Sequence, residues 1–319
     1  MSSSFPDSET LRTALALAVR APSVHNSQPW RWRVATHSLH LYADPSRHLS
    51  ATDPDRRDLL ISCGATLHHC VTALARLGWK ATVHRIPDPG HPDHLAVLTL
   101  APAVPYEADI AMATAIPRRR ADRRHYSGRE ANAADIALLG ARVARAGVTL
   151  RRVECLTSLN TIVKQAVSRH IEDRAYLSEL NRWSGRYASL AGVPAHNTPT
   201  SDPDAPIPGR LFAGPVLAQP PNSPGCTDHA VVLALGTRDD DTLARLRAGE
   251  ATSLLLLAAT SADMACCPIT EPLEITETRA ALREELFDGR EYPQVLIRVG
   301  RVAEDAAPLP ATPRRTLRV

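Results

Sequence analysis

The sequence lacks the short motifs of the commonest nucleotide-binding and hydrolytic sites. No two of its 15 glycines are separated by a single residue, so neither a Rossmann fingerprint nor a kinase-type glycine loop is present. Gly-x-Ser-x-Gly and His-Glu-x-x-His are also missing, which removes the usual serine hydrolase and zinc protease signatures. The longest wholly apolar runs, of which residues 254–259 are one, are far below the ~20 residues that a membrane span needs. We therefore expect no membrane partner.

Charge and cysteine content are equally modest. The formal net charge of +3 over 319 residues is too small to indicate nucleic-acid binding by itself. The six cysteines have no repeating spacing, as expected for reduced thiols, and we expect no metal site. Residues 1–7 contain no basic region followed by an apolar run, so no signal peptide is visible. These features predict a soluble, cytoplasmic protein.

Hydrophobic periodicity predicts a mixture of helices and strands. A helix that begins at Asp7 or Ser8 should end before Pro22, and longer helices are expected over 57–77 and 243–264. Strands are expected over 38–43, 80–85, 95–100 and 293–299. Gly249 and Ala258 follow Gly64 and Ala73 at a constant offset, which indicates a weak internal duplication.

Residues 183–229 form the least regular stretch and contain nine prolines. A connector this long within a compact chain is a lid, a wrap or a disordered linker. Trp183, Tyr187, Leu211 and Phe212 give it apolar surface to bury, which favours an ordered lid. We refer to residues 183–229 as the proline-rich segment.

Residues 21–32, Ala-Pro-Ser-Val-His-Asn-Ser-Gln-Pro-Trp-Arg-Trp, concentrate short polar side chains between two prolines. If this stretch is extended, Asn26 and Gln28 point to one face, while Trp30 and Trp32 anchor the chain to a core. That layout suits a flat polar heterocycle. The alternative is a helix-to-strand turn whose polar residues satisfy the backbone.

Residues 116–126 contain five arginines within seven positions, 118–124. Such a run is a solvated face or an anion site, because guanidinium groups bind phosphate oxygens two at a time. A nucleic-acid surface through Arg118–Arg124 is a competing interpretation. The low net charge and the lack of interleaved aromatic residues other than Tyr126 weigh against it.

Two further stretches carry weaker signals. Cys266 and Cys267 are adjacent, but without Cys-x-x-Cys spacing they are better interpreted as core residues than as a redox or metal pair. Residues 308–315 end in two arginines and are either a phosphate-binding return of the chain or a disordered basic tail. His68 and His69 diverge by about 100° on a helix, so metal binding is not expected there.

Taken together, these motifs resemble those of the flavin-dependent nitroreductase superfamily, and most closely its mycobacterial Acg-like branch. Residues 21–30 are similar to the signature Ala-Pro-Ser-x-x-Asn-x-Gln-Pro-Trp, and residues 28–33 continue as Gln-Pro-Trp-Arg-Trp-Arg in that branch. Residues 119–123 resemble the Arg-Arg-Thr/Ser-x-Arg/Lys motif that holds the FMN phosphate and ribityl chain. Ala121 departs from it, because the usual hydroxyl is missing.

The resemblance implies a set of cofactor-binding residues, while no catalytic residue is assigned. Backbone groups of Thr270 and Glu271 would contact the flavin, and Arg314, or next to it Arg315, would return to the phosphate. His25 could hydrogen-bond the flavin, but its position varies in the family. The implied FMN-binding set is Pro22, Ser23, Val24, Asn26, Gln28, Arg119, Arg120, Arg123, Thr270, Glu271, Arg314 and Arg315.

The resemblance also implies an α+β, nitroreductase-like fold. In an ordinary nitroreductase each flavin touches two subunits. Here residues 1–103 carry the Gln-Pro-Trp motif and residues 104–319 carry the arginines, so the two halves complement each other. We expect an intramolecular pseudo-dimer with one FMN per chain, the proline-rich segment inserted as a lid, and a monomeric or homodimeric assembly.

Two functions follow from the resemblance. The first is NAD(P)H-dependent reduction of a small electron acceptor, a nitroaromatic or a quinone. The alternative is a non-catalytic protein that stores or sequesters FMN beneath the lid. Binding and turnover are separate properties, because a lid over the flavin would exclude the nicotinamide.

Overall fold

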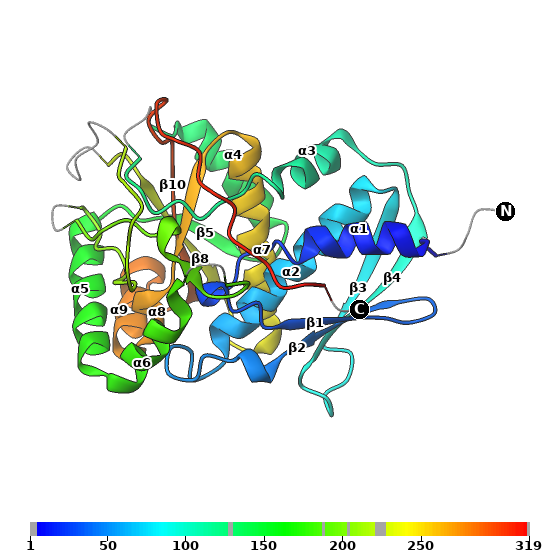
Figure 1. Ribbon diagram of the computed structural model, residues 1–319, viewed down its shortest axis with the longest axis horizontal. Coiled ribbons are helices and arrows are strands. Elements are labelled where there is room, and N and C mark those ends of the chain that lie inside the picture. Colours follow the sequence, from blue (N-terminus) through cyan, green and yellow to red (C-terminus); the bar gives the residue numbers. More distant parts are fainter. Residues whose placement is uncertain (1–4, 127–129, 187–188, 203–204, 221–227, 318–319) are drawn as a thin grey trace.

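The computed structural model describes residues 5–126, 130–186, 189–202, 205–220 and 228–317. The expected contribution of Tyr187 to the proline-rich segment falls outside these residues. Helices and antiparallel sheets are mixed along the chain, which confirms the α+β class. Two long helices pack against each other through the middle of the molecule, with a four-stranded sheet on either side (Figure 1).

The first half of the chain builds one sheet around one long helix. Its elements are α1 (Ser8–Ala18), η1 (Val24–Asn26), β1 (Trp30–Val34), β2 (Leu39–Ala43), η2 (Pro45–Arg47), α2 (Arg57–Arg76), β3 (Trp79–Arg85) and β4 (His94–Pro102). The strands are antiparallel in the order β1-β2-β4-β3. The helices and strands predicted in this half are confirmed with ends shifted by one or two residues.

The second half repeats this arrangement with additions. After α3 (Glu107–Ala115) come α4 (Ala133–Ala144), β5 (Thr149–Arg152), α5 (Leu156–Glu172), α6 (Arg174–Trp183), β6 (Ser184–Arg186), β7 (Val193–Pro194) and η3 (Ala195–Asn197). The chain continues through β8 (Val231–Thr237), α7 (Thr242–Ser261), β9 (Ala265–Ile269), α8 (Glu271–Glu274), α9 (Thr276–Phe287) and β10 (Tyr292–Gly300). This sheet has the order β5-β8-β10-β9 and is also antiparallel.

The two sheets therefore share one topology. In each, a helix precedes two strands and a 20-residue helix follows them. The last two strands then pair so that the fourth strand in sequence is next to the second, and the third lies at the edge of the sheet. The connection between β5 and β8 is long and carries α5, α6 and the proline-rich segment, whereas β1 and β2 are joined by a short turn. The same unit thus occurs twice, and the additions lie in the second copy.

The central helix pair is closely packed because glycines face each other at the crossing. A Cβ placed on Gly64 of α2 would lie 2.0 Å from the Leu246 carbonyl oxygen, and one on Gly249 of α7 would lie 2.0 Å from the Ile61 carbonyl oxygen. These contacts are reciprocal: Gly64 meets Leu246, Gly249 meets Ile61, and 246 and 249 follow 61 and 64 at the same offset. Only glycine permits this backbone approach.

Burial explains the remaining sequence patterns. Asp7 Oδ1 accepts a hydrogen bond from Thr10 N at 2.7 Å and starts α1, whose Leu11 and Leu15 are buried. β8 is buried along its whole length because α7 covers one face of its sheet and α5 and α9 lie toward the other. Among the described helices, α2 alone has the length and apolar composition of a membrane span, and 83% of that window is buried within the fold.

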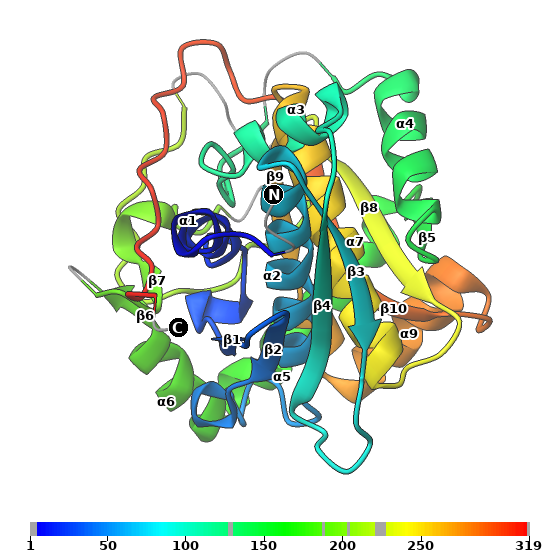
Figure 2. The ribbon, with the colours of Figure 1, turned by 90° about the vertical axis from the view of Figure 1, so that its right-hand side faces the viewer.

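The C-terminal segment, residues 301–317, returns from the second half to the first (red in Figures 1 and 2). It ends beside residues 26–28, just before β1, with which it shares hydrogen bonds described below. The two halves are therefore joined by both the α2–α7 pair and this returning segment.

Candidate functional site

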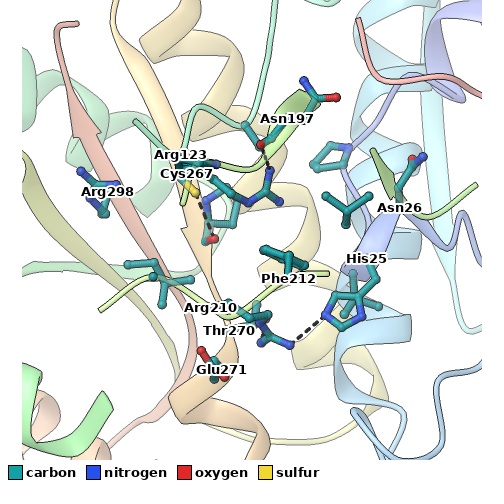
Figure 3. Close-up of a pocket in the computed structure, with 18 of the residues that line it drawn as sticks. His25, Asn26, Arg123, Asn197, Arg210, Phe212, Cys267, Thr270, Glu271 and Arg298 are labelled. Carbon is teal, nitrogen blue, oxygen red and sulfur yellow. Dashed lines mark hydrogen bonds between the residues drawn. The ribbon is translucent and has the colours of Figure 1, made fainter. Parts of the chain in front are cut away.

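A cavity of about 220 Å³ lies between the two halves. Residues from both halves, from the proline-rich segment and from the C-terminal segment line it (Figure 3). Nine of the twelve residues in the expected FMN-binding set are among them: Pro22, Ser23, Val24, Asn26, Arg119, Arg123, Thr270, Glu271 and Arg314. Gln28, Arg120 and Arg315 do not line this cavity.

Residues 23–28 form a tight turn, so the expectation of an extended segment is wrong. Val24–Asn26 is a short 3₁₀ helix, and φ is positive at His25 (44°), Asn26 (52°) and Gln28 (52°). Ser23 Oγ accepts the Gln28 N–H at 3.0 Å, and Ser62 Oγ on α2 accepts the Val24 N–H at 3.1 Å. Polar side chains therefore satisfy the turn backbone, while Trp30 and Trp32 are buried as expected.

The amides of Asn26 and Gln28 hold other segments in place. Asn26 Nδ2 donates to the carbonyl oxygens of Gly192 at 3.1 Å and Pro313 at 3.2 Å. Gln28 Nε2 donates to the Leu190 carbonyl oxygen at 2.8 Å, and Gln28 Oε1 accepts the Arg315 N–H at 2.9 Å. Both side chains thus fasten the proline-rich segment and the C-terminal segment to the first half.

Arg119 is a buried cation that lacks an anionic partner among the described residues. Only 6% of the residue is exposed, and its one hydrogen bond runs from Nη2 to the Arg20 carbonyl oxygen at a long 3.4 Å. Within the described chain, Nε and Nη1 have no hydrogen-bond partner. The pKa of Arg119 is lowered to about 10, mainly by burial and secondly by the positive charge of Arg120.

Arg314 and Arg20 extend this positive cluster. Arg314 donates to the carbonyl oxygens of Val19, Arg20 and Ala21 at 3.0–3.1 Å, where α1 ends. Burial, followed by the charges of Arg119, Arg20 and Arg120, lowers its pKa to about 9. Arg20, Arg119, Arg120 and Arg314 also surround a small space that shares residues with the main cavity. We call these four residues the arginine cluster.

The remaining arginines of the 118–124 run have separate environments. Arg118 is exposed and pairs with Asp263 at 3.2 Å, whereas Arg124 is buried and pairs with Asp122 at 2.8 Å. Arg123 donates to the Asn197 carbonyl oxygen at 3.2 Å, and its guanidinium lies 4.9 Å from the centre of the Phe212 ring. These side chains do not form one continuous solvated face.

Arg210, from the proline-rich segment, crosses the lower part of the cavity in Figure 3. Its Nη1 contacts His25 Nε2 at 2.8 Å and the Tyr176 hydroxyl at 3.1 Å. Its Nη2 donates to Thr270 Oγ1 at 3.3 Å and also to Glu274. Arg210 therefore connects both halves, and the ring of Phe212 packs edge-on against His25 with 5.8 Å between ring centres.

Glu271 lies beside this network. It is 4% exposed and its Oε1 is 3.3 Å from His170 Nδ1. Burial opposes its charge, but Arg210 and the hydrogen bond from His170 lower its pKa overall. Cys267 on β9 also lines the cavity, and burial raises its pKa, in keeping with the expected core role of Cys266 and Cys267. No group of three potential metal ligands occurs in the described part of the chain.

Sequence reasoning missed several residues that line the cavity or its cationic end. Arg20 directly precedes residues 21–32, and its place beside that motif was the one feature of the sequence that could have indicated its role. Arg210 and Phe212 lie in the irregular proline-rich segment, where no periodicity could place them. Asp58, Arg298 and Asn197 also line the cavity and belong to no recognised motif.

Comparisons with known proteins identify the family. The chain matches no protein-family model. It is 59% identical over 317 residues to "Putative NAD(P)H nitroreductase Rv3131" of Mycobacterium tuberculosis, covering 99% of this chain and 92% of the relative. It is 37% identical over 320 residues to "Putative NAD(P)H nitroreductase acg" of the same species, covering 97% and 94%.

Among solved structures, the FMN-dependent nitroreductase NfnB from Mycobacterium smegmatis, in complex with NADPH, is 17% identical, covering 66% of this chain and 96% of that chain with a TM-score of 0.39. A Bacteroides fragilis nitroreductase with bound FMN is 16% identical, covering 61% and 90% with a TM-score of 0.40.

Fold and site define a mixed α+β protein in which four arginines, without an anionic partner among the described residues, lie at one end of a cavity. The chain matches the two Mycobacterium tuberculosis relatives along nearly its whole length, and this similarity identifies its family. The chain belongs to the Acg-like branch of the nitroreductase superfamily.

Proposed function

We propose that the chain binds one FMN in this cavity and uses it in NAD(P)H-dependent reduction of nitroaromatics or quinones. The observation that carries the proposal is the unpaired guanidinium of Arg119, which is buried among Arg20, Arg120 and Arg314. A buried cation surrounded by further cations favours binding of an anion, and a phosphate monoester matches the bidentate geometry of arginine. The site residues present thus fit the phosphate of FMN.

The same proposal assigns the rest of the expected set. The arginine cluster and Arg123 would hold the phosphate and ribityl chain, and the Pro22–Val24 turn and the Thr270–Glu271 backbone would line the ring. Asn26, Gln28 and Arg315 would act indirectly, by fastening the segments that close the site. Ala121 offers no hydroxyl, so backbone groups would replace one side-chain hydrogen bond.

We further propose that the chain is an intramolecular pseudo-dimer of residues 1–103 and 104–319. The shared strand order of the two sheets and the reciprocal contacts of Gly64 and Gly249 support this relation. A two-fold axis that brings Gly64 against Leu246, the equivalent of Ile61, also brings Ile61 against Gly249, the equivalent of Gly64. The signature of one half and the arginines of the other then complete a single site. A cytoplasmic monomer or a homodimer is compatible with this arrangement.

When bound, FMN supplies the hydride chemistry that the side chains alone cannot perform. The protein supplies binding, orientation and exclusion of water. The names of the Mycobacterium tuberculosis relatives favour NAD(P)H as the electron donor. A small planar acceptor would have to enter the same cavity.

A second candidate function, sequestration of FMN without turnover, is favoured by one observation. Arg210 and Phe212 of the proline-rich segment line the cavity, where Arg210 bonds to both halves and Phe212 packs against His25 and Arg123. If these side chains remain in place over the flavin ring, a nicotinamide cannot stack on it. The proline-rich segment would then serve as a closed lid.

Anaerobic absorbance of the purified protein separates the two functions. An oxidoreductase shows a flavin band that NADPH or NADH bleaches and that a nitroaromatic or quinone restores. A sequestering protein shows a flavin band that dithionite bleaches but neither nucleotide changes. Absence of a flavin band after FMN is supplied would overturn both, and salt-dependent retention on DNA would then test the interpretation of Arg118–Arg124 as a nucleic-acid surface.

A further inference from the structure

Residues 307–317, the last part of the C-terminal segment, run along the cavity outside any helix or strand, and Thr312 and Arg314 line its wall. We call these residues the strap (red in Figure 1). None of them is fully buried, and three are prolines, which have no backbone N–H. Within the described chain, the strap makes no backbone–backbone hydrogen bond. Besides the contact of Leu317 with the core of the first half, polar side chains must therefore hold the strap in place.

Arg314 uses every N–H group of its guanidinium on backbone carbonyl oxygens. Nε and Nη2 donate to the carbonyl groups of residues 19–21, and Nη1 donates to those of residues 312 and 313 within the strap itself. All five distances are 3.0–3.1 Å. A guanidinium has five N–H donors, so this arrangement leaves none of them for a ligand.

Arg119 is the opposite case within the same arginine cluster. Its Nε and Nη1 have no hydrogen-bond partner among the described residues. A phosphate beside the cluster therefore finds unpaired N–H groups on Arg119 and none on Arg314. Arg314 adds positive charge to the cluster, but its hydrogen bonds serve to connect two segments of the chain.

The carbonyl groups that Arg314 binds outside the strap follow the end of α1 and lead directly into the turn at residues 22–24, which lines the cavity. Carbonyl groups at the end of a helix lack partners within the helix, and an arginine side chain satisfies them. On the other side of the turn, Gln28 Oε1 accepts the Arg315 N–H at 2.9 Å. The strap and the signature turn thus hold each other, with Arg314 donating three of the bonds between them.

We propose that Arg314 is a positioning residue that latches the strap over the cavity, rather than a direct ligand of the phosphate. The inference rests on the proposed binding of FMN and adds how the flavin is retained. While Arg314 is bonded to residues 19–21, the strap closes the cavity and the signature turn is fixed. When these bonds break, the strap lifts and a flavin can enter or leave. Closure therefore favours a bound flavin whether or not it carries a phosphate.

The first test needs no ligand. In hydrogen–deuterium exchange of the ligand-free, full-length protein, the strap should open separately from the core. The Arg315 amide should exchange at a rate that low concentrations of urea do not change, whereas amides of α2 and α7 should exchange only through urea-dependent unfolding. Exchange of the strap together with α2 and α7 would overturn the inference.

Arg314→Lys tests the latch in the same experiment. Lysine keeps the positive charge but cannot bridge the two sets of carbonyl groups, so the Arg315 amide should exchange roughly 10-fold faster. Arg301→Lys is the matched control. Arg301 begins the C-terminal segment and donates to the carbonyl oxygens of Ala262 and Asp263 at 3.3 Å. Because β10 already anchors the chain at Gly300, strap exchange should be unchanged in this control.

The second test separates a latch from a phosphate ligand. Calorimetric titrations with FMN and with riboflavin give two affinities for each variant. In Arg314→Lys both should fall by the same factor, roughly 10-fold, because closure is lost while the charge is kept. Arg119→Met, by contrast, should lower the affinity for FMN alone. A loss in Arg314→Lys that is confined to FMN would overturn the inference and make Arg314 a phosphate ligand. Wild-type affinity for both flavins would also overturn it.

These readouts keep the inference apart from the function on which it rests. If neither flavin binds, the proposed function fails, and faster exchange of the ligand-free strap in Arg314→Lys still supports the latch. If FMN binds and NAD(P)H reduces it, but the strap of Arg314→Lys exchanges as in wild type, the inference alone fails. If Arg314→Lys does not fold, the urea dependence of strap exchange in wild type decides.

Discussion

At the scale of single residues, the site is distinguished by positive charges that have no anionic partner among the described residues. Arg119 is buried with two nitrogen atoms that lack partners in the described structure, and Arg314 donates only to backbone carbonyl groups. Such cations reduce the stability of the ligand-free protein, because burial removes hydration that nothing replaces. In the proposed function, the FMN phosphate would supply the missing contacts.

Replacing Arg119 by Met should therefore change binding and stability in opposite directions. We expect FMN affinity to fall roughly 10- to 100-fold, as expected for the loss of a charge-assisted hydrogen bond. The melting temperature of the ligand-free variant should be equal to or above that of wild type, since a buried unpaired charge is removed. Calorimetric titration and thermal unfolding measure the two effects.

Arg118→Met is the matched control for this experiment. Arg118 is exposed and already paired with Asp263, so its loss should leave FMN affinity within about twofold. Equal losses in both variants would show that the run acts only through its net charge.

Buried histidines provide a prediction on pH. His69 is fully buried, and burial lowers its pKa well below 6.5. The unfolded chain then binds more protons than the folded chain below about pH 6.5, so this residue contributes stability at neutral pH that is lost as the pH falls. Relative to His69→Gln, wild type should lose up to about 1.4 kcal/mol per pH unit in urea unfolding below pH 6.5. A pH-independent difference between the two would contradict this account.

At the scale of secondary-structure elements, the crossing of α2 and α7 is the most constrained contact. Gly249→Ala would place a Cβ 2.0 Å from the Ile61 carbonyl oxygen, so the helices would have to separate. We expect a loss of roughly 1–3 kcal/mol or more in urea unfolding, as for overpacked cores. The gain in helix propensity is about 1 kcal/mol and cannot compensate.

Gly140→Ala in α4 is the matched helical control. Its Cβ would lie 3.5 Å from Leu150 Cδ2, an ordinary contact, so the substitution should be neutral or slightly stabilising. A similar loss of stability in both variants would mean that the close approach at Gly249 is not what limits substitution.

Phe212 tests whether the proline-rich segment closes the cavity. Phe212→Ala removes the ring that packs against His25 and Arg123. If the segment excludes the nicotinamide, the variant should bleach with NADPH faster than wild type in stopped-flow absorbance, with FMN content unchanged. Equal or slower bleaching would contradict a closed lid. Leu211→Ala, at an exposed neighbouring position, is the control.

Helices and strands were predicted correctly where hydrophobic periodicity and the residues that begin or end an element indicated the same bounds. The long helices α2 and α7 and the strands β2, β3, β4 and β10 follow from apolar spacing between glycine, proline and capping residues. At residues 23–28 the alternative of a helix-to-strand turn is the one observed. Prolines at 22 and 29 favour extended neighbours, but the turn is held by backbone N–H groups that donate to Ser23 and Ser62. Ser62 is 39 positions from Ser23, so local sequence could not reveal that contact.

The same limit applies to the site. Nine of the twelve expected residues line the cavity because their motifs are local, and the resemblance placed them. Arg210 and Asp58 reach the cavity through tertiary packing, and no pattern around them signals it. Gln28 was expected to face the ligand, yet its side-chain amide donates to the Leu190 carbonyl oxygen and accepts the Arg315 N–H.

At the scale of the whole molecule, one strand order occurs twice, and residues from both halves line one cavity. The two sheets share their strand order, α2 and α7 cross at reciprocal glycines, and the C-terminal segment returns to the first half. The arginine cluster draws on both halves and on that segment. A second equivalent site would require an arginine motif in residues 1–103 and a second Gln-Pro-Trp motif in residues 104–319, and the sequence has neither.

The most direct test of this account is a calorimetric titration of flavin-free protein with FMN, with riboflavin as the comparison. The account predicts one FMN bound per chain, and riboflavin binding that is weaker by roughly 10-fold or more, because the arginine cluster needs the phosphate. Two FMN per chain would contradict the single composite site. No binding, or equal affinity for riboflavin, would contradict the phosphate role of the arginines.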